Sequence, residues 1–231
     1  SDSDEYDLYY WHLFLWDQKA SQLAGAYRLG PGDEIMARYG KRGFYLHSLF
    51  RMKAAFHPWL AQAVELGRSF VLPDYQRQRL PLFLLWKGIY TFLGRHTQYR
   101  YLLGPVSISN DYRPLSRSFI VAFIRRYYFD AELARLVRPR KAFRPARGQA
   151  DPEALAEGVG NGDLRQADMV LDALEPAHAR LPILLKKYIK QNARIIGFNV
   201  DPKFNQALDG LIIMDLKDLP VETARGMERD S

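Results

Sequence analysis

The sequence contains no cysteine, and this absence excludes a disulfide framework, a thiolate metal site and a cysteine nucleophile together. It also fits a reducing, cytoplasmic compartment. No apolar run approaches the roughly 18 to 20 residues that a membrane-spanning helix needs, since the longest candidates, Leu80–Trp86 and Ile120–Phe123, are short. The chain opens with acidic residues where a secretory signal would be basic. The sequence therefore predicts a cytoplasmic protein that is either soluble or peripheral at the inner membrane.

The chain has 231 residues, of which 48% are hydrophobic and 13% aromatic, so we expect a folded protein with a sizeable core. Its net charge of +7 favours an acidic partner, which could be nucleic acid, an anionic lipid surface or an acidic carrier protein. The basic aromatic segment Arg125–Tyr128 lies in an amphipathic pattern, which a core face and a solvated face explain better than nucleic-acid binding does. We therefore expect no nucleic-acid partner.

Hydrophobic patterning predicts a protein of the α+β, or mixed α/β, class built around one sheet. Strands are expected at Tyr10–Trp16, Leu23–Leu29, Ala63–Leu72, Tyr99–Ile108, Ala193–Val200 and Gly210–Leu216. Helices are expected at Arg51–Gln62, Leu80–Leu93, Leu115–Tyr128 and Leu181–Gln191. Residues 1–231 are expected to form one domain, in which the range 145–165, rich in Ala, Gly and Pro, is a flexible excursion.

Glu65 and Arg68 lie within a strand-forming segment, where ionisable side chains are costly to bury unless they are paired or used. Residues three apart point to opposite faces of a regular strand, but a bulge, for which Gly67 is suited, would bring both to one side. One interpretation makes Glu65 a general base or an amine-positioning carboxylate, with Arg68 as its partner. The other is a structural salt bridge at a sheet edge, and the residues alone leave both open.

A basic loop, Tyr75–Pro81, follows this strand and leads into the helix expected at Leu80–Leu93. Backbone N–H groups at a helix N-terminus attract phosphate, and Arg77 and Arg79 would add to that attraction. A strand followed by such a loop and a helix suits a pyrophosphate or a phosphopantetheine arm. A solvated basic turn explains the same residues equally well.

His12 and Asp17 have the His-x-x-x-x-Asp spacing that glycerolipid acyltransferases use for a base and its orienting carboxylate. The four residues between them are typical of a strand, which would separate the two side chains by roughly 16 Å, too far for a hydrogen bond. We interpret the spacing as coincidence. The other histidines have no metal-ligand spacing, so neither a metal site nor a bound cofactor is expected.

Several strings of residues resemble known families. Asp4-Glu5-Tyr6-Asp7 before an apolar strand, then Gly25-Ala26-Tyr27-Arg28-Leu29 and Glu65-Leu66-x-Arg68-x-x-Val71, resemble the acyl-homoserine-lactone synthases and, still more, the ornithine-lipid N-acyltransferases. The tail, from Gly197 to Leu211, resembles hemolysin-like bacterial proteins that carry this acyltransferase domain, often fused to a lysophospholipid acyltransferase domain. The resemblance covers about residues 4–112 and 180–216.

The resemblance implies a GNAT fold, in which the strands Ala63–Leu72 and Tyr99–Ile108 splay apart to admit an acyl thioester. It implies an acyltransferase that moves a long-chain fatty-acyl group onto the amine of an amino acid or an amino-acid-derived lipid precursor. The implied donor is acyl carrier protein, which is acidic, or otherwise coenzyme A. Contact with the membrane surface would suit a lipid product.

The resemblance also implies a set of site residues. By match, Glu65 and Arg68 fall at the catalytic positions, and Asp4, Asp7 and Arg28 at the positions that shape the amine site. The residues expected to contact the acyl thioester and its pantetheine arm are Phe70, Val71, Leu72, Arg77, Gln78, Arg79 and Ser107. The oxyanion would be held by backbone N–H groups of the bulged strand near Phe70–Leu72, with no covalent acyl-enzyme.

Two features depart from the family pattern. The loop after the active strand reads Arg77-x-x-Leu80-x-Leu82 and lacks the usual glycines, so its backbone is expected to approach phosphate less closely. The chain also begins inside the pattern, so we expect the N-terminal strand and helices of the domain to be missing. Two alternative functions stay open: O-acylation of a lysophospholipid, and a non-catalytic module that docks a carrier protein or a membrane.

Overall fold

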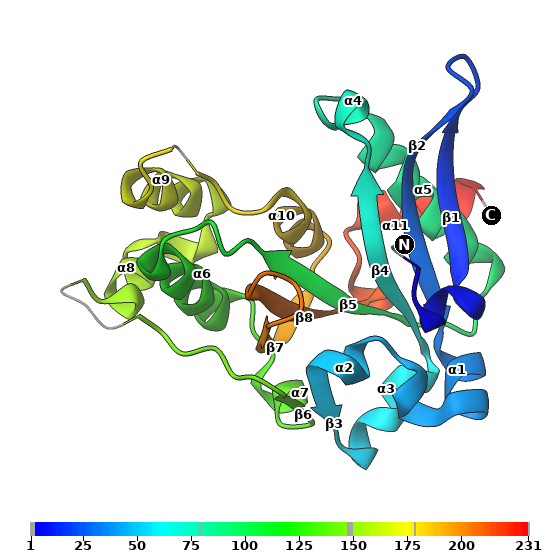
Figure 1. The fold of residues 1–231 in the computed structure, drawn as a ribbon, viewed down its shortest axis with the longest axis horizontal. Helices are drawn as coiled ribbons and strands as arrows, with labels where there is room; N and C mark the ends of the chain where they lie inside the picture. Colours follow the sequence, from blue (N-terminus) through cyan, green and yellow to red (C-terminus); the bar gives the residue numbers. More distant parts are fainter. Residues whose placement is uncertain (1–2, 79, 147–149, 178, 231) are drawn as a thin grey trace. The chain divides into compact units, whose positions relative to one another are not determined.

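The computed structural model describes residues 3–78, 80–146, 150–177 and 179–230 (Figure 1). It contains a mixed six-stranded sheet, in which the strands lie in the order β1 (Trp11–Asp17), β2 (Gln22–Pro31), β4 (Ala63–Val71), β5 (Tyr101–Ile108), β8 (Ala207–Asp215) and β7 (Arg194–Asp201). A smaller sheet pairs β3 (Phe50–Met52) with β6 (Val137–Pro139). Helices flank the strands, which confirms the mixed α/β class predicted from the sequence.

The α-helices of the described ranges are α1 (Gly32–Tyr39), α2 (Leu46–Leu49), α3 (His57–Ala61), α4 (Pro73–Gln76), α5 (Leu80–Arg95), α6 (Pro114–Tyr127), α7 (Ala131–Ala134), α8 (Pro152–Gly158), α9 (Leu164–Leu174), α10 (Ile183–Lys190) and α11 (Val221–Asp230). Short 3₁₀ helices lie at Glu5–Leu8, Gly40–Gly43, Ala54–Phe56, Gly160–Gly162 and Leu216–Asp218. Within the described ranges, none of the helices is long and apolar enough to cross a membrane.

The chain forms two compact units. Unit 1 consists of Ser1–His47, His57–Gly104 and Asp215–Ser231, and unit 2 consists of Ser48–Phe56 and Pro105–Met214. Unit 1 contains β1, β2, β4 and α5, and unit 2 contains α6 and the β7–β8 pair. Strand β5 contributes its first half to unit 1 and its second half to unit 2.

Strands β1 and β2 form the antiparallel hairpin that alternating apolar residues predict, with Trp11 opposite Leu29 at one end and Asp17 opposite Gln22 at the other. The Asp17 carboxylate accepts hydrogen bonds from the backbone N–H groups of Lys19 and Ala20 in the turn, at 2.9 and 3.1 Å. A short polar side chain that satisfies backbone donors in this way fixes a turn. The hairpin is therefore determined by local sequence.

Strand β4 pairs antiparallel with β2 and carries the predicted bulge. Ala26 lies opposite Phe70 and Arg28 opposite Gly67, so two residues of β4 face one residue of β2. The residue with left-handed backbone is Arg68, with φ of 46°, and not Gly67 as the sequence suggested. An L-residue in this conformation is strained, so the surrounding contacts of Arg68 must hold it there.

Strands β4 and β5 are parallel, and their register pairs join Ala63–Glu65 to Tyr101–Leu103. At the next position the backbones are in close contact, because a Cβ on Gly104 would lie 2.4 Å from the Leu66 carbonyl oxygen. In the described part of the chain, the rest of β4, from Gly67 to Val71, is paired on the β2 side. The parallel pairing is therefore confined to the first residues of both strands.

Helix α5 packs on one face of the β1–β2 part of the sheet (Figure 1). A Cβ on Gly88 would lie 3.0 Å from Leu13 Cδ1, so the helix packs closely on β1. Its side chains Leu85, Ile89 and Leu93 are buried. The helix begins at the predicted residue and ends two residues later than expected. Glu65 and Arg28 are on the opposite face, and all of these residues belong to unit 1.

Unit 2 is organised around α6, whose side chains Phe119, Ile120 and Phe123 are fully buried. This helix lies within one residue of its predicted position at each end. Strands β7 and β8 pair antiparallel, from Arg194 opposite Ile213 onwards, as two consecutive strands joined by a short turn should.

Two predicted segments differ from the structure, and two helices were not expected. The helix expected at Arg51–Gln62 is replaced by strand β3, a 3₁₀ helix and the short α3. The range 145–165 contains α8, because Asp151 accepts a hydrogen bond from Glu153 N–H at 3.0 Å and Pro152 occupies the first helical turn. These start signals were read as loop residues, while residues 147–149 lie outside the described ranges. Helices α1 and α9 were not predicted.

Candidate active site

The carboxylate of Glu65 lies in the interior of unit 1, where its side chain is only 1% exposed. Oε2 accepts hydrogen bonds from the Tyr10 hydroxyl and, at 3.1 Å, from the backbone N–H of Tyr45. Oε1 accepts one from the backbone N–H of Leu46 at 2.7 Å. Both oxygens thus have fixed donors, and the side chain has one orientation.

Burial raises the pKa of Glu65 from 4.5 to about 7, because the ionised form loses its hydration. The hydrogen bonds from Tyr10, Leu46 and Tyr45, and the charge of Arg28, lower this pKa and so partly offset the burial. A carboxylate whose pKa lies near neutrality can accept a proton from a substrate and release it again at physiological pH.

A network of charged side chains lies on the same face as Glu65. Arg28 Nη1 contacts Asp4 Oδ1 at 2.6 Å and Asp7 Oδ1 at 2.9 Å, and Arg68 Nη2 contacts Asp4 Oδ2 at 3.0 Å. The two aspartates also form a capping box, since Asp7 accepts from Asp4 N–H at 2.9 Å and Asp4 from Tyr6 N–H at 3.1 Å. The structure therefore brings the predicted residues Asp4, Asp7, Arg28 and Arg68 together.

Arg28 is the centre of this network and is only 2% exposed. Burial by itself would lower its pKa, but the hydrogen bonds to Asp7 and Asp4 outweigh that effect and raise it. Its guanidinium also lies 5.1 to 6.0 Å from the ring centroids of Tyr6, Tyr10 and Tyr45. The cation is thus stabilised by carboxylates and by aromatic faces.

The expected pairing of Glu65 with Arg68 is not what the structure contains. Arg68 is 44% exposed and binds Asp4, whereas Glu65 is buried and bound by Tyr10 and backbone N–H groups. The guanidinium whose charge lowers the pKa of Glu65 is that of Arg28. The bulge explains the difference, because its extra residue turns Arg68 toward the N-terminal segment.

The residues Phe70, Val71 and Leu72, expected at the thioester, close β4. The Leu72 N–H donates to the Ala24 carbonyl at 2.9 Å and so faces β2. The Val71 carbonyl accepts from Gln76 Nε2 at 2.8 Å. Because N–H and C=O of one strand residue point to the same side, the Val71 N–H is directed to the edge away from β2. The expectation that the Leu72 N–H holds the oxyanion is therefore wrong, because this N–H is bonded to β2. The Val71 N–H is oriented so that it could hold the oxyanion.

The basic loop contains the unpredicted helix α4, which Arg77 caps through a backbone hydrogen bond to the Tyr75 carbonyl. Gln78 N–H donates to the same carbonyl at 3.2 Å, and helix α5 begins two residues later. Arg79 lies outside the described residues. Arg77 and Gln78 are exposed, as a phosphate contact would require.

Ser107 belongs to unit 2 and donates to Asp209 Oδ1 at 2.6 Å. Burial, followed by the nearby charge of Asp201, raises the pKa of Asp209 to about 6 although the hydrogen bond from Ser107 lowers it. The Ser107 hydroxyl therefore has a partner on β8. Asp209 lies in the tail whose residues resemble the hemolysin-like proteins, but no role was predicted for it.

The His12–Asp17 spacing is confirmed as coincidence, because the two side chains have different partners. His12 Nε2 lies 3.3 Å from the Asp7 carbonyl oxygen, whereas Asp17 Oδ2 accepts from the Tyr75 hydroxyl at 2.7 Å. In the described ranges, no group of three or more His, Asp or Glu side chains could hold a metal ion.

Sequence reasoning missed the role of Tyr10. Gly30 lies opposite Glu65 on β2, and a Cβ on Gly30 would lie 2.4 Å from Tyr10 Cε1. The absence of a side chain at Gly30 therefore makes room for the Tyr10 ring against the face of β2. Gly30, which directly follows the strand expected at Leu23–Leu29, was the available signal.

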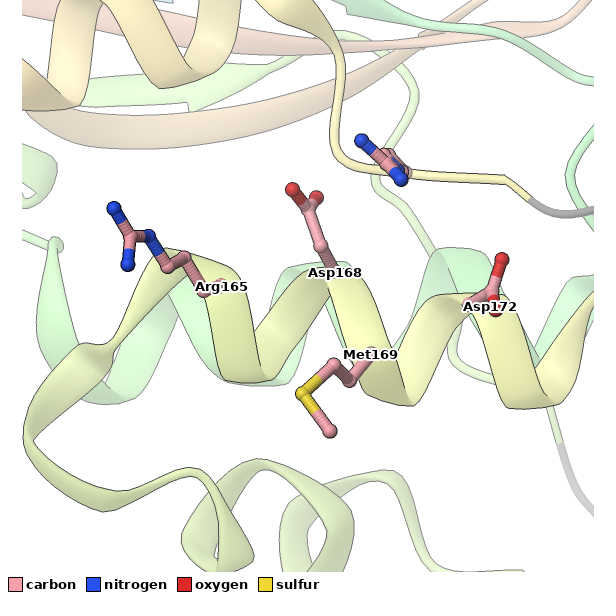
Figure 2. Close-up of a pocket in the computed structure, with 5 residues that line it drawn as sticks. Arg165, Asp168, Met169 and Asp172 are labelled. Atoms are coloured by element: carbon pink, nitrogen blue, oxygen red, sulfur yellow. The ribbon is translucent and has the colours of Figure 1, made fainter.

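A separate hollow of about 350 Å³ lies on α9 in unit 2, lined by Arg165, Asp168, Met169, Asp172 and Arg180. Figure 2 shows Asp168 and Met169 on opposite sides of the helix. Asp168 is engaged by Lys186 Nζ at 2.7 Å and by the Leu181 N–H at 2.8 Å. The hollow contains none of the predicted site residues.

Comparison with known proteins supports the GNAT-type resemblance that the sequence indicated. Residues 1–86 match the family model of the acetyltransferase (GNAT) domain. The chain is 30% identical over 151 residues to a glycine N(alpha)-acyltransferase of Phocaeicola vulgatus, covering 61% of this chain and 46% of that protein. It is 28% identical over 235 residues to an L-ornithine N(alpha)-acyltransferase of Agrobacterium fabrum, covering 97% of this chain and 69% of that protein.

The chain spans about half the length of the glycine N(alpha)-acyltransferase that it matches. Among solved structures, the loading GNATL domain of CurA from Lyngbya majuscula covers 89% of this chain and 76% of its own, with 13% identity and a TM-score of 0.41. An aminoglycoside 6'-N-acetyltransferase complexed with coenzyme A covers 92% and 74%, with 10% identity and a TM-score of 0.43. On the sequence matches, residues 1–86 are similar to the acetyltransferase (GNAT) domain, and the names of the relatives are consistent with a GNAT N-acyltransferase of the ornithine-lipid type.

Proposed function

We propose that this protein transfers a long-chain fatty-acyl group from an acyl-carrier-protein thioester to the amine of an amino acid or an amino-acid-derived lipid precursor. The observation that carries the proposal is the buried Glu65, whose pKa of about 7 suits a general base, beside a network of two arginines and two aspartates. The names of the relatives, which act on glycine and ornithine, support an amino-acid acceptor.

The chemistry requires an amine that has lost its proton before it attacks the thioester carbonyl. Glu65 takes that proton, through one water because its side chain is buried. The new C–N bond forms as the C–S bond breaks, and the electron pair of that bond leaves with the carrier thiol. The nitrogen then loses its second proton to the departing thiolate, and the proton held by Glu65 is released to water, so that no covalent acyl-enzyme is needed.

The oxyanion that develops on the thioester carbonyl needs a fixed donor. The backbone N–H of Val71 is directed to the edge of β4 away from β2, where a thioester could lie along the strand. In this proposal the exposed guanidinium of Arg68, which contacts Asp4, binds the carboxylate of an amino-acid acceptor.

The charge of the chain supports an acyl-carrier-protein donor. Acyl carrier protein is acidic and suits a chain with a net charge of +7, and a loop without glycine is poorly adapted to the pyrophosphate of coenzyme A. Peripheral contact with the inner membrane would deliver the lipid product to its destination.

Transfer from palmitoyl-carrier protein and from palmitoyl-coenzyme A to glycine, ornithine and other amino acids would test the function, with products identified by mass spectrometry. We expect an alkali-stable amide, formed faster from the carrier-protein thioester. An alkali-labile ester formed from a lysophospholipid would instead show O-acylation. Carrier binding without turnover by any acceptor would show a docking module.

A further inference from the structure

A partly buried arginine in unit 2 has uncharged groups as its hydrogen-bond partners. Arg117, near the start of α6, donates from Nη2 to the Gln206 carbonyl oxygen at 3.0 Å and from Nη1 to Asn110 Oδ1. Its buried Nε has no acceptor within the described ranges. The buried Arg28, in contrast, is paired with Asp4. A buried charge without a counterion is costly, so Arg117 suits an anion from outside the chain.

The pKa values of the two arginines show the same contrast. Burial lowers the pKa of Arg117, because the charged form loses its hydration. For Arg28 the hydrogen bonds to Asp7 and Asp4 outweigh burial and raise the pKa. Among the described residues, no carboxylate does the same for Arg117. Its charge is therefore not compensated by the chain.

A second cation meets Arg117 at Gln206. Lys141 Nζ donates to Gln206 Oε1 at 2.6 Å, and this partner is also uncharged. The backbone of Lys141 lies beside β7, since its N–H donates to Asn199 Oδ1 and its carbonyl accepts from Val200 N–H, both at 2.8 Å. The Lys141 side chain is exposed. Two cations are thus brought to one neutral residue.

Gln206 belongs to the turn between β7 and β8, and this turn is strained. Asn205 and Gln206 both have left-handed backbone, with φ of 46° and 53°, which residues with a side chain rarely adopt. Such strain persists where surrounding contacts hold it, and the two cations supply such contacts. The same turn carries Phe204, which is 64% exposed, next to the exposed Lys203.

We call Arg117, Lys141, Lys203 and Phe204 the basic patch. All four residues belong to unit 2. In the described ranges, none of the three cations forms an ion pair with a carboxylate of the chain.

The acidic residues of this region do not cancel the charge of the basic patch. Asp201 is 6% exposed and accepts a backbone hydrogen bond at 2.8 Å, and Asp209 is 3% exposed. Asp111 is exposed and accepts from Ser109 Oγ at 2.7 Å. The range 138–144 adds four cations and no acidic residue. The surface is therefore basic, with one exposed aromatic side chain.

We propose that the basic patch binds the phosphate groups of an anionic lipid surface, with the Phe204 ring at the boundary between headgroups and acyl chains. The inference rests on the membrane contact of the proposed function and gives that contact a surface. Each Lys or Arg near an anionic lipid surface strengthens binding by about fivefold. Aromatic side chains favour the boundary region because one part of it is apolar and the other wet.

The exposed phenylalanine favours a lipid surface over the other anions that the same cations would attract. A free phosphate ion gains nothing from an apolar side chain. A protein partner would need an area of about 800 Å² on each side, with an apolar centre wider than one ring. A lipid surface needs cations at the headgroups and an apolar side chain that enters it.

The test measures binding of the whole chain to vesicles by co-sedimentation. One set contains phosphatidylcholine alone, and the other contains equal parts of phosphatidylcholine and phosphatidylglycerol. We expect the wild type to bind the second set roughly 30-fold more strongly. Lys141→Gln with Lys203→Gln should weaken that binding by roughly 30-fold, and Phe204→Ser by about tenfold. These side chains are exposed, so folding should be unaffected, which circular dichroism checks.

Matched controls remove the same groups elsewhere. Lys19→Gln with Lys53→Gln removes two exposed lysines, and Ile183→Ser removes a side chain that is 72% exposed. Both controls should bind like the wild type. An equal loss in the lysine control would overturn the basic patch, because net charge alone would then explain the binding. An equal loss in Ile183→Ser would overturn the role of Phe204.

Calorimetry with inorganic phosphate and with apo acyl carrier protein separates the other sources of negative charge. We expect neither ligand to lose affinity in the double lysine variant. Tight binding of inorganic phosphate that survives in Phe204→Ser would assign the cations to a free phosphate and overturn the lipid surface. Carrier-protein binding that is lost in the double lysine variant would overturn it in favour of an acidic protein. Vesicle binding that the double lysine variant leaves unchanged would overturn the inference outright.

Failure of the inference and failure of the proposed function are distinguishable, because vesicle binding is measured without turnover. Acyl transfer to soluble glycine is measured without vesicles. Transfer by a protein that does not bind vesicles would remove the inference and leave the acyltransferase activity. Vesicle binding through the basic patch without any transfer would do the reverse.

Discussion

The buried carboxylate of Glu65 makes stability depend on pH in a direction that can be worked out. Its pKa is raised from 4.5 to about 7 on folding, so between these values the native state holds a proton that the unfolded state has lost. The resulting stabilisation is fully present below pH 4.5 and is lost as the pH rises through 7. At ~1.4 kcal/mol per pKa unit, this group contributes about 3 kcal/mol at most.

Glu65→Gln removes the titration while keeping the shape of the side chain. The free energy of unfolding of the variant, relative to the wild type, should therefore rise by about 2 to 3 kcal/mol between pH 5 and pH 8. At pH 5 the free energy of unfolding of Glu65→Gln should be lower than that of the wild type. The amide cannot accept hydrogen bonds from both the Tyr10 hydroxyl and the Tyr45 N–H. Urea unfolding followed by circular dichroism at both pH values measures the change.

Glu34→Gln is the control, because that carboxylate is exposed on α1. Its free energy of unfolding should run parallel to that of the wild type across the same range. Parallel curves for Glu65→Gln and the wild type would refute the reasoning, since Glu65 would then have an ordinary pKa in the folded protein.

Further predictions concern the groups around Glu65. Tyr10→Phe removes a donor that lowers the pKa of Glu65, so the pH midpoint of acyl transfer should move above 7; an unmoved midpoint in a pH–rate profile would contradict this. Arg28→Ala leaves Asp4 without its buried partner and should lower the free energy of unfolding in urea by about 3 kcal/mol; an unchanged value would contradict this. Gly30→Ala should push the Tyr10 ring off Glu65 and cost about 1 to 3 kcal/mol; wild-type stability would show that the ring can move freely.

The parts of the fold that depend on neighbouring residues could be predicted from the sequence. The β1–β2 hairpin and helices α5 and α6 have clear periodicity and clear ends, and each is found within two or three residues of its expected position. The region after β2 could not be predicted, because α1 and α3 are short and are held by a close contact: a Cβ on Gly32 would lie 1.9 Å from the Leu60 carbonyl oxygen. Such a contact between distant residues leaves no periodic signal.

The candidate site was only partly predictable for the same reason. The resemblance selected Asp4, Asp7 and Arg28, and the structure brings them together. It could not show that the bulge would turn Arg68 toward Asp4, because the left-handed backbone occurs at an arginine, where sequence gives no warning. The donors to Glu65 include backbone N–H groups, which every residue has and no motif reports.

The pH dependence of kcat/KM for acyl transfer tests the central claim most directly, measured for the wild type and for Glu65→Gln with the same acceptor. If Glu65 is the base, the wild-type profile rises with pH to a midpoint near 7, and the variant loses about 100-fold or more together with that midpoint. A variant that keeps wild-type activity and the same profile would show that the proton goes elsewhere.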